Sequence, residues 1–148
     1  MRIDKKSLFL SVGVCLLPIL IGVYYFNVLP EQIAVHFNVS GEPDNFVSKT
    51  HAIIGVPIFL AIVQIIISLV VDFDKTPKKG ALIIKGIIPV ISVLVQGGIV
   101  AYALDNNFNV PQLTVFVIGI VVIILGNYLP KKEFWGKYNF NLFGLEKG

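Results

Sequence analysis

The side chains best suited to chemistry gather in one polar segment, residues 30–51. It holds two histidines, His36 and His51, and the carboxylates Glu42 and Asp44. Imidazole and carboxylate groups are ligands that zinc accepts, but their spacing here forms no HExxH or comparable metal motif. The pattern favours a polar turn in which a short side chain, Asp44 or Asn38, bonds nearby backbone N–H groups, and no metal site is predicted.

Nucleophilic chemistry has no better support in the sequence. Ser40 lies near His36 and Asp44, which are the residue types of a hydrolase triad, but the segment has no nucleophile elbow and no second wall to hold a substrate. The single cysteine, Cys15, lies in an apolar run, so it forms neither an intrachain disulfide nor a CxxC pair. We therefore expect no catalytic residue, no cofactor and a protein that is not an enzyme.

Long apolar runs surround this segment. Of the 148 residues, 55% are hydrophobic and 14% are charged, and the mean hydropathy is +0.83, whereas soluble domains are about 45–50% apolar. Crossing a bilayer takes roughly 20 apolar residues, and four runs approach this length: residues 8–29, 52–71, 81–104 and 111–129. Their only charged residue is Lys85, whose long stem is expected to reach the membrane surface. The sequence predicts an all-α integral membrane protein with four transmembrane helices, forming a single membrane domain over residues 1–148 with the lipid bilayer as its partner and no nucleic acid.

The basic residues predict the orientation. Eleven of the twelve Lys and Arg residues belong to the ends and to the connection between the second and third runs. The other side holds only Lys49 beside four carboxylates: Glu31, Glu42, Asp44 and Asp105. The positive-inside rule then places both termini in the cytoplasm of a multi-pass plasma-membrane protein. The first run spans 22 residues without a small-residue cleavage pattern, so it is predicted to be a retained helix rather than a signal peptide.

The outer loop, residues 30–51, is longer than a helical hairpin needs. Residues 32–39 alternate between apolar and other side chains, which is the period of a half-buried strand. Residues 40–45 are dense in turn formers. We expect a short outer strand-and-turn hairpin between the first two helices, with Phe46 returning to cover its apolar face and the helix ends supporting it.

Polar residues within the spans are expected to bond across helices, while glycines allow close approach of the backbones. These residues are Asn27, Gln64, Ser68, Ser92, Gln96, Thr114 and Asn127. A polar path through the membrane is the alternative, but no acidic residue lies inside an apolar run. Residues 130–148 mix lysines with aromatics and are predicted to form an amphipathic cytoplasmic tail at the membrane surface.

Two segments carry a family resemblance. Residues 29–44, LPEQIAVHFNVSGEPD, resemble the signature LP-x-x-I-x-x-H-[WF]-[ND]-x-x-G-x-[PA]-D of a small bacterial membrane domain of unknown function. That domain also forms the N-terminal part of SdpI-type immunity proteins, and residues 126–131, GNYLPK, resemble a second conserved segment of that family. The resemblance implies binding positions in the outer loop and a structural motif at the end of the fourth span, which are His36, Asn38, Gly41 and Asp44, and Asn127, Tyr128 and Pro130.

The resemblance implies a non-enzymatic protein that protects a cell against a secreted, membrane-active peptide toxin. Family members usually continue with an N-x-x-x-G-[IV]-R-T-P-W-T stretch and two further spans. Here residues 139–145 match loosely and lack Arg-Thr-Pro-Trp, which makes this chain a shortened four-span form. Two alternatives stay open: an accessory or regulatory subunit of another membrane protein, and a small transporter acting as a homo-oligomer.

Overall fold

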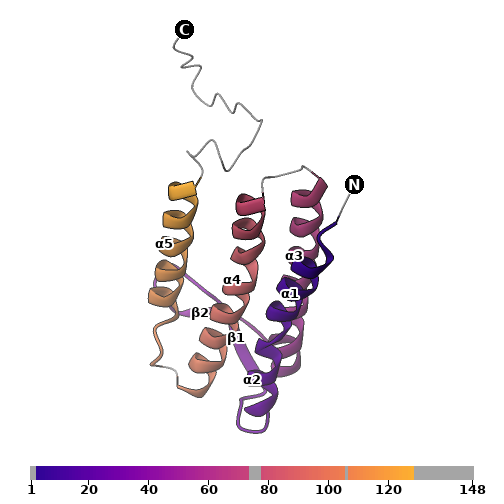
Figure 1. Ribbon diagram of the computed structural model, residues 1–148. Helices are drawn as coiled ribbons and strands as arrows, with labels where there is room; N and C mark the ends of the chain where they lie inside the picture. The colour runs from indigo at the N-terminus through magenta and orange to yellow at the C-terminus, as the bar shows by residue number, and fades with distance from the viewer. Residues whose placement is uncertain (1–2, 74–77, 106, 129–148) are drawn as a thin grey trace.

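The computed structural model describes residues 3–73, 78–105 and 107–128, and it is mostly helical (Figure 1). Its elements are α1 (Lys5–Leu16), α2 (Pro18–Tyr24), β1 (Gln32–Phe37), β2 (Pro43–Ser48), the π-helix η1 (His51–Gly55), α3 (Val56–Phe73), α4 (Lys78–Leu104) and α5 (Val110–Tyr128). Within these described residues, four stretches are long and apolar enough to cross a membrane, namely Lys5–Tyr24, His51–Phe73, Gly80–Leu104 and Val110–Asn127. The prediction of a membrane protein with four such helices is confirmed.

The helices form a three-helix core with a fourth helix at its side. α1, α3 and α4 pack against one another, and α5 packs chiefly against α4 (Figure 1). Only 6% of the apolar stretch in α5 is buried, against 22–33% in the other three. One face of α4 therefore remains open beside α5, and the candidate site described below lies on this face.

Three buried prolines, Pro18, Pro57 and Pro89, each remove a backbone donor from the apolar interior. A proline has no N–H, so a carbonyl one turn earlier loses its partner, and in lipid an unsatisfied carbonyl costs several kcal/mol. Pro89 leaves the carbonyl of Lys85 open in this way. Gln64 of α3 supplies the missing donor, because its Nε2 lies 2.9 Å from the Lys85 oxygen.

Two side chains of α4 bond carbonyls at the other interruptions. Ser92 Oγ donates to the carbonyl of Cys15 at 2.8 Å, next to the break between α1 and α2. Gln96 Nε2 donates to the carbonyl of Ala52 at 3.2 Å. In a π-helix the bonds run from residue i to i+5, so the backbone donor to Ala52 would be Pro57, which has none. Gln64, Ser92 and Gln96 thus bond across helices, as expected, and each serves an interrupted helix.

The expectation of cross-helix bonding is wrong for Ser68, whose Oγ accepts from Gln64 Nε2 of the same helix at 3.0 Å, and for three exposed residues. Thr114 Oγ1 donates to Val110 of its own helix at 3.0 Å. Asn27 and Asn127 are exposed near the ends of the first and last spans. These three polar groups need no partner on another helix, because each has either a carbonyl one turn earlier or open surroundings.

Lys85, whose long stem suggested an ammonium group at the membrane surface, carries that group to the end of α3 and is buried there by an acidic partner. Its side chain is 3% exposed, and its Nζ lies 2.6 Å from Asp72 Oδ1 near the end of α3. The second carboxylate oxygen of Asp72 accepts the backbone N–H of Asp4 at 3.1 Å. A carboxylate partner offsets much of the cost of burying an ammonium group, which explains why the side chain turns inward. This pair joins the ends of α1, α3 and α4.

The two strands form an antiparallel sheet whose apolar side rests on α4. Ile33 of β1 is buried, and the ring of Phe37 meets that of Tyr102 edge to face, with 4.9 Å between centroids. Phe46 does not cover this side, since it is 50% exposed. It pairs with Ala34, and paired residues of neighbouring strands project to the same face, so Phe46 lies on the face opposite Ile33.

Candidate functional site

His36 and Asp44 come together on the exposed surface of the two-stranded sheet. His36 Nδ1 donates to Asp44 Oδ1 at 2.5 Å, and the side chains are 66% and 42% exposed. The register is irregular on either side of His36, which pairs with Asn45 and so stands beside Asp44. Because Nδ1 is engaged by the carboxylate, the ring is oriented with Nε2 as the nitrogen available to a ligand.

Asn38 and Gly41 shape the turn between the strands. Asn38 Oδ1 accepts the backbone N–H groups of Ser40 at 2.9 Å and Glu42 at 3.0 Å. The backbone of Asn38 also exchanges bonds with Gly41 and Glu42. The polar turn inferred from the sequence is present, and Asn38 is the side chain that organises it. Its amide oxygen is therefore occupied by the chain itself.

Gly41 holds this turn against the start of α5. Its φ is +84°, a left-handed conformation that L side chains rarely adopt. A Cβ at this position would lie 2.9 Å from Pro111 Cγ, so only glycine allows such close contact. Together with the Phe37–Tyr102 contact, this places the sheet across α4 and its turn beside α5.

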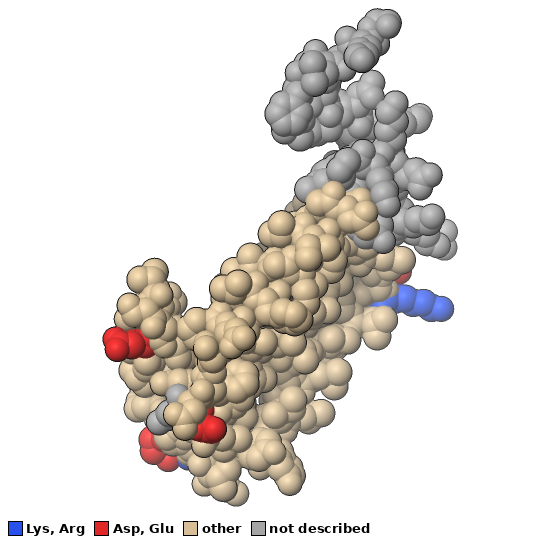
Figure 2. All heavy atoms as spheres, turned by 90° about the vertical axis from the view of Figure 1, so that its left-hand side faces the viewer, with Lys and Arg blue, Asp and Glu red and all other residues tan. Residues whose placement is uncertain are grey.

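An apolar hollow of about 600 Å³ lies between α4, α5 and the edge of β1. Ligand pockets occupy roughly 300–1,000 Å³. We call this hollow the α4–α5 groove; β1 lines its rim through residues 35–37, and among its walls are Ile91, Leu94 and Val95 of α4 and Leu113, Ile118 and Val121 of α5. Figure 2 shows the molecule from the α5 side, with a lobe at the lower left that a notch separates from the main body.

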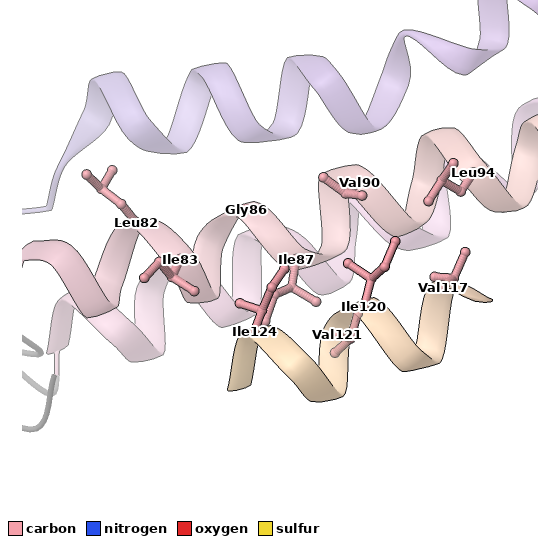
Figure 3. Close-up of a pocket in the computed structure, with 10 residues that line it drawn as sticks. All are labelled: Leu82, Ile83, Gly86, Ile87, Val90, Leu94, Val117, Ile120, Val121 and Ile124. Atoms are coloured by element: carbon pink, nitrogen blue, oxygen red, sulfur yellow. The ribbon is translucent and has the colours of Figure 1, made fainter. Parts of the chain in front are cut away.

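A second hollow of about 360 Å³ continues along the same two helices toward the far end of α5 (Figure 3). The labelled residues come from α4 and α5, and all of them are apolar or glycine. Both hollows share Leu94, Val117 and Val121. The apolar lining is therefore continuous from the sheet to the opposite half of the helices.

Acidic side chains lie around the rim of the groove. Glu42 and Asp44 are exposed on the sheet, and Asp105 is exposed at the end of α4. Lys49, the basic residue of this region, donates to Glu31 at 2.8 Å, so its charge is offset. Figure 2 shows the acidic side chains of this face gathered toward the lower end of the molecule. A cation is therefore favoured at this end and an anion is disfavoured.

The remaining candidate residues lie apart from this cluster. His51 bonds Ser48, with 2.6 Å between Nδ1 and Oγ, and does not join His36. Asn127 and Tyr128 end α5 far from the sheet (Figure 1), while Pro130 and the predicted tail, residues 130–148, lie outside the described residues. In the part of the chain that the structure describes, no three His, Cys, Asp or Glu side chains group as metal ligands would.

Sequence reasoning missed the groove and the Asp72–Lys85 pair. The groove depends on where α5 docks, and the one sequence signal that bears on this is Gly98 of α4. In the structure a Cβ at Gly98 would lie 2.7 Å from Leu113 Cδ2 of α5. The pair depends on which residue of α3 faces Lys85. The sequence did offer one signal, because Asp72 directly follows the second apolar run and is the acidic residue nearest to its end.

Comparison with known proteins gives one match. Residues 13–61 match the family described as "Domain of unknown function (DUF1648)". This segment extends from α1 through the sheet into α3, so it contains His36, Asn38, Gly41 and Asp44. No curated protein and no solved structure matches the chain. The family match agrees with the resemblance of residues 29–44 to a small membrane domain of unknown function, and the fold is that of a multi-pass membrane protein.

Proposed function

We propose that this protein is a non-enzymatic plasma-membrane protein that protects its cell against a secreted, membrane-active peptide. The observation that carries the proposal is the position of the His36–Asp44 pair at the rim of an apolar groove. A cationic amphipathic peptide offers positive charge to an acidic rim and apolar side chains to a groove. The resemblance to SdpI-type immunity proteins implies the same activity.

In this proposal the sheet faces the outside of the cell and both termini face the cytoplasm. Support comes from the basic residues, because eleven of twelve belong to the ends of the sequence or flank the connection between the second and third apolar runs. A secreted peptide would then meet the acidic rim before it reached the membrane interior. In the same orientation, the basic side faces the anionic lipids of the inner leaflet and is attracted to them.

Survival of a sensitive strain tests the proposal. The strain is grown with and without this protein against a panel of secreted membrane-active peptides, and a C-terminal tag reports the membrane level. We expect protection against one peptide, and loss of that protection in the double variant His36→Ala, Asp44→Asn at an unchanged membrane level. The double variant Glu31→Gln, Lys49→Gln is the matched control, because it removes another ion pair of the same region. Absence of protection by the unaltered protein at confirmed expression contradicts the proposal.

A second candidate is an accessory subunit that docks on another membrane protein. The low burial of α5 favours it, because only 6% of that apolar stretch is buried within the chain. Purification in mild detergent distinguishes the two functions. One stoichiometric foreign partner, lost when Gly119 and Gly126 on α5 are replaced by Leu, would favour the accessory role, whereas a second copy of this chain would indicate a homo-oligomer.

A further inference from the structure

We propose that the α4–α5 groove seats the apolar side chains of a cationic amphipathic helical peptide, whose positively charged end lies at the His36–Asp44 rim. The inference rests on the proposed function, since it assigns a place and a direction to the peptide. It goes further because it assigns a role to α4 and α5, which lie outside the matched family segment, residues 13–61. The sheet, which belongs to that segment, lines the groove together with these two helices.

The first step concerns charge. Glu42, Asp44 and Asp105 are exposed at this end, and Lys49 is engaged with Glu31, which is also exposed. A phospholipid would bring an anionic phosphate to this rim, where the carboxylates repel it. Lysine or arginine side chains at the end of a peptide are attracted instead. The charge of the rim therefore favours a cationic peptide over an anionic lipid headgroup.

The second step concerns the shape of the groove. Inside a membrane, lipid tails are as apolar as the lining, so burial alone selects no occupant and close packing decides between them. The groove runs along two helices, which suits a row of side chains at i, i+3, i+4 and i+7 of a third helix. Ile118 and Val121 of α5 and Ile91 and Leu94 of α4 line it.

The third step concerns the position of the rim, which is fixed relative to the groove. The sheet is held on α4 by the Phe37–Tyr102 contact and on α5 by the approach of Gly41 to Pro111. His36 and Val35 belong to both the sheet and the groove lining. The protein thus fixes the spacing between the rim and the groove before a helix binds. This preorganisation lowers the ordering cost of binding.

Photo-crosslinking tests this placement in the full chain reconstituted in lipid nanodiscs. The probe is a synthetic peptide of about 20 residues, long enough to cross the bilayer, rich in leucine and alanine and with its lysines at one end. Benzoylphenylalanine replaces Ile118 in one variant and Ile123 in another. Ile123 is the matched control, because it is on the same helix, is 72% exposed and lines neither hollow.

We expect crosslinking at Ile118 to exceed that at Ile123 by at least about tenfold, which corresponds to roughly 1.4 kcal/mol. A peptide with glutamates in place of the lysines should crosslink poorly, and Glu42→Gln with Asp44→Asn should abolish the difference between the two peptides. Equal crosslinking at both positions, equal crosslinking of both peptides, or no crosslinking at all would overturn the inference. Crosslinking of Ile118 to a second copy or to phospholipid in place of the peptide would overturn it as well.

A separate pair of variants keeps this inference distinguishable from the proposed function. Ile118→Trp fills the groove, and Ile123→Trp makes the same change where no groove lies. If the unaltered protein protects cells and both variants protect equally, the groove assignment is wrong while the protective function stands. If the probe crosslinks as expected but no peptide in the survival panel is resisted, the protective function is wrong while the site stands.

Discussion

The polar residues inside the spans stabilise interrupted helices. Gln64, Ser92 and Gln96 each donate to a carbonyl of another helix, and each of these carbonyls lies close to a proline interruption. Because water is absent from the bilayer interior, an open carbonyl there must find a donor within the protein. Each of these polar side chains therefore supplies a donor near a proline. The loss of stability on removing the side chain should then depend on whether the proline is present.

Replacing Gln64 with leucine tests this dependence. The Gln64→Leu variant leaves the Lys85 carbonyl without a donor, and we expect the free energy of unfolding to fall by about 1–3 kcal/mol. In a Pro89→Ala background the backbone N–H returns, so the same substitution should cost much less. Unfolding in detergent micelles, analysed as a double-mutant cycle, measures the difference. Gln112→Leu, at an exposed position of α5, is the control. An equal loss in both backgrounds contradicts the pairing.

The buried pair of Asp72 and Lys85 gives a second residue-scale prediction. Lys85→Met leaves a buried carboxylate without its cation and should lower the free energy of unfolding by roughly 3–5 kcal/mol. The double variant Lys85→Met, Asp72→Leu should be more stable than Lys85→Met alone, because no charge remains buried. Glu31→Gln breaks an exposed pair and should cost at most about 1 kcal/mol. A double variant less stable than the single one would contradict the assignment.

At the scale of elements, the sheet depends on one turn that packs on α5. The Gly41→Ala variant places a Cβ at a φ of +84° and within 2.9 Å of Pro111 Cγ. The left-handed conformation alone costs about 1–2 kcal/mol for an L residue. We expect faster hydrogen exchange over β1 and β2 and unchanged exchange in α3. Gly13→Ala, where a Cβ would meet nothing within 4 Å, is the control. Faster exchange throughout the helices would contradict a local role for the turn.

The sequence predicts elements well where one physical constraint decides them. The thickness of the bilayer sets the length of an apolar helix, so the four runs identify four helices directly. The docking of helices is different, because an apolar stretch such as α5 has no polar face to indicate its neighbours. The groove could not be assigned for that reason. The partner of Lys85 could not be assigned either, because it depends on which residue of α3 faces Lys85.

The candidate site was predictable only in part. The resemblance of residues 29–44 pointed to His36 and Asp44, and the structure places them in contact. The sequence left open whether Asn38 or Asp44 bonds the N–H groups of the turn, and the structure shows that Asn38 does. The position of Phe46 depends on strand register, where a shift by one residue turns a side chain to the other face.

At the scale of the whole molecule, charge is distributed unevenly between the two ends. The end that carries the sheet holds Glu42, Asp44 and Asp105, while the exposed Lys5 and Lys6 lie near the start of α1 at the other end. A membrane protein with this asymmetry inserts with its basic end toward the cytoplasm. The proposed function requires this orientation, because a secreted peptide must meet the acidic rim from outside.

Labelling of single cysteines in intact cells measures the orientation. Cys15 is fully buried, so the unaltered protein should give only a low background with a membrane-impermeant maleimide. Ser40→Cys lies in the exposed turn of the sheet, and Asn127→Cys lies at the exposed end of α5. We expect the first to be labelled in intact cells and the second only after permeabilisation. The reverse pattern would place the acidic rim in the cytoplasm, where a peptide arriving from outside does not reach it, and would thereby rule out both the protective function and the direction assigned to the bound peptide.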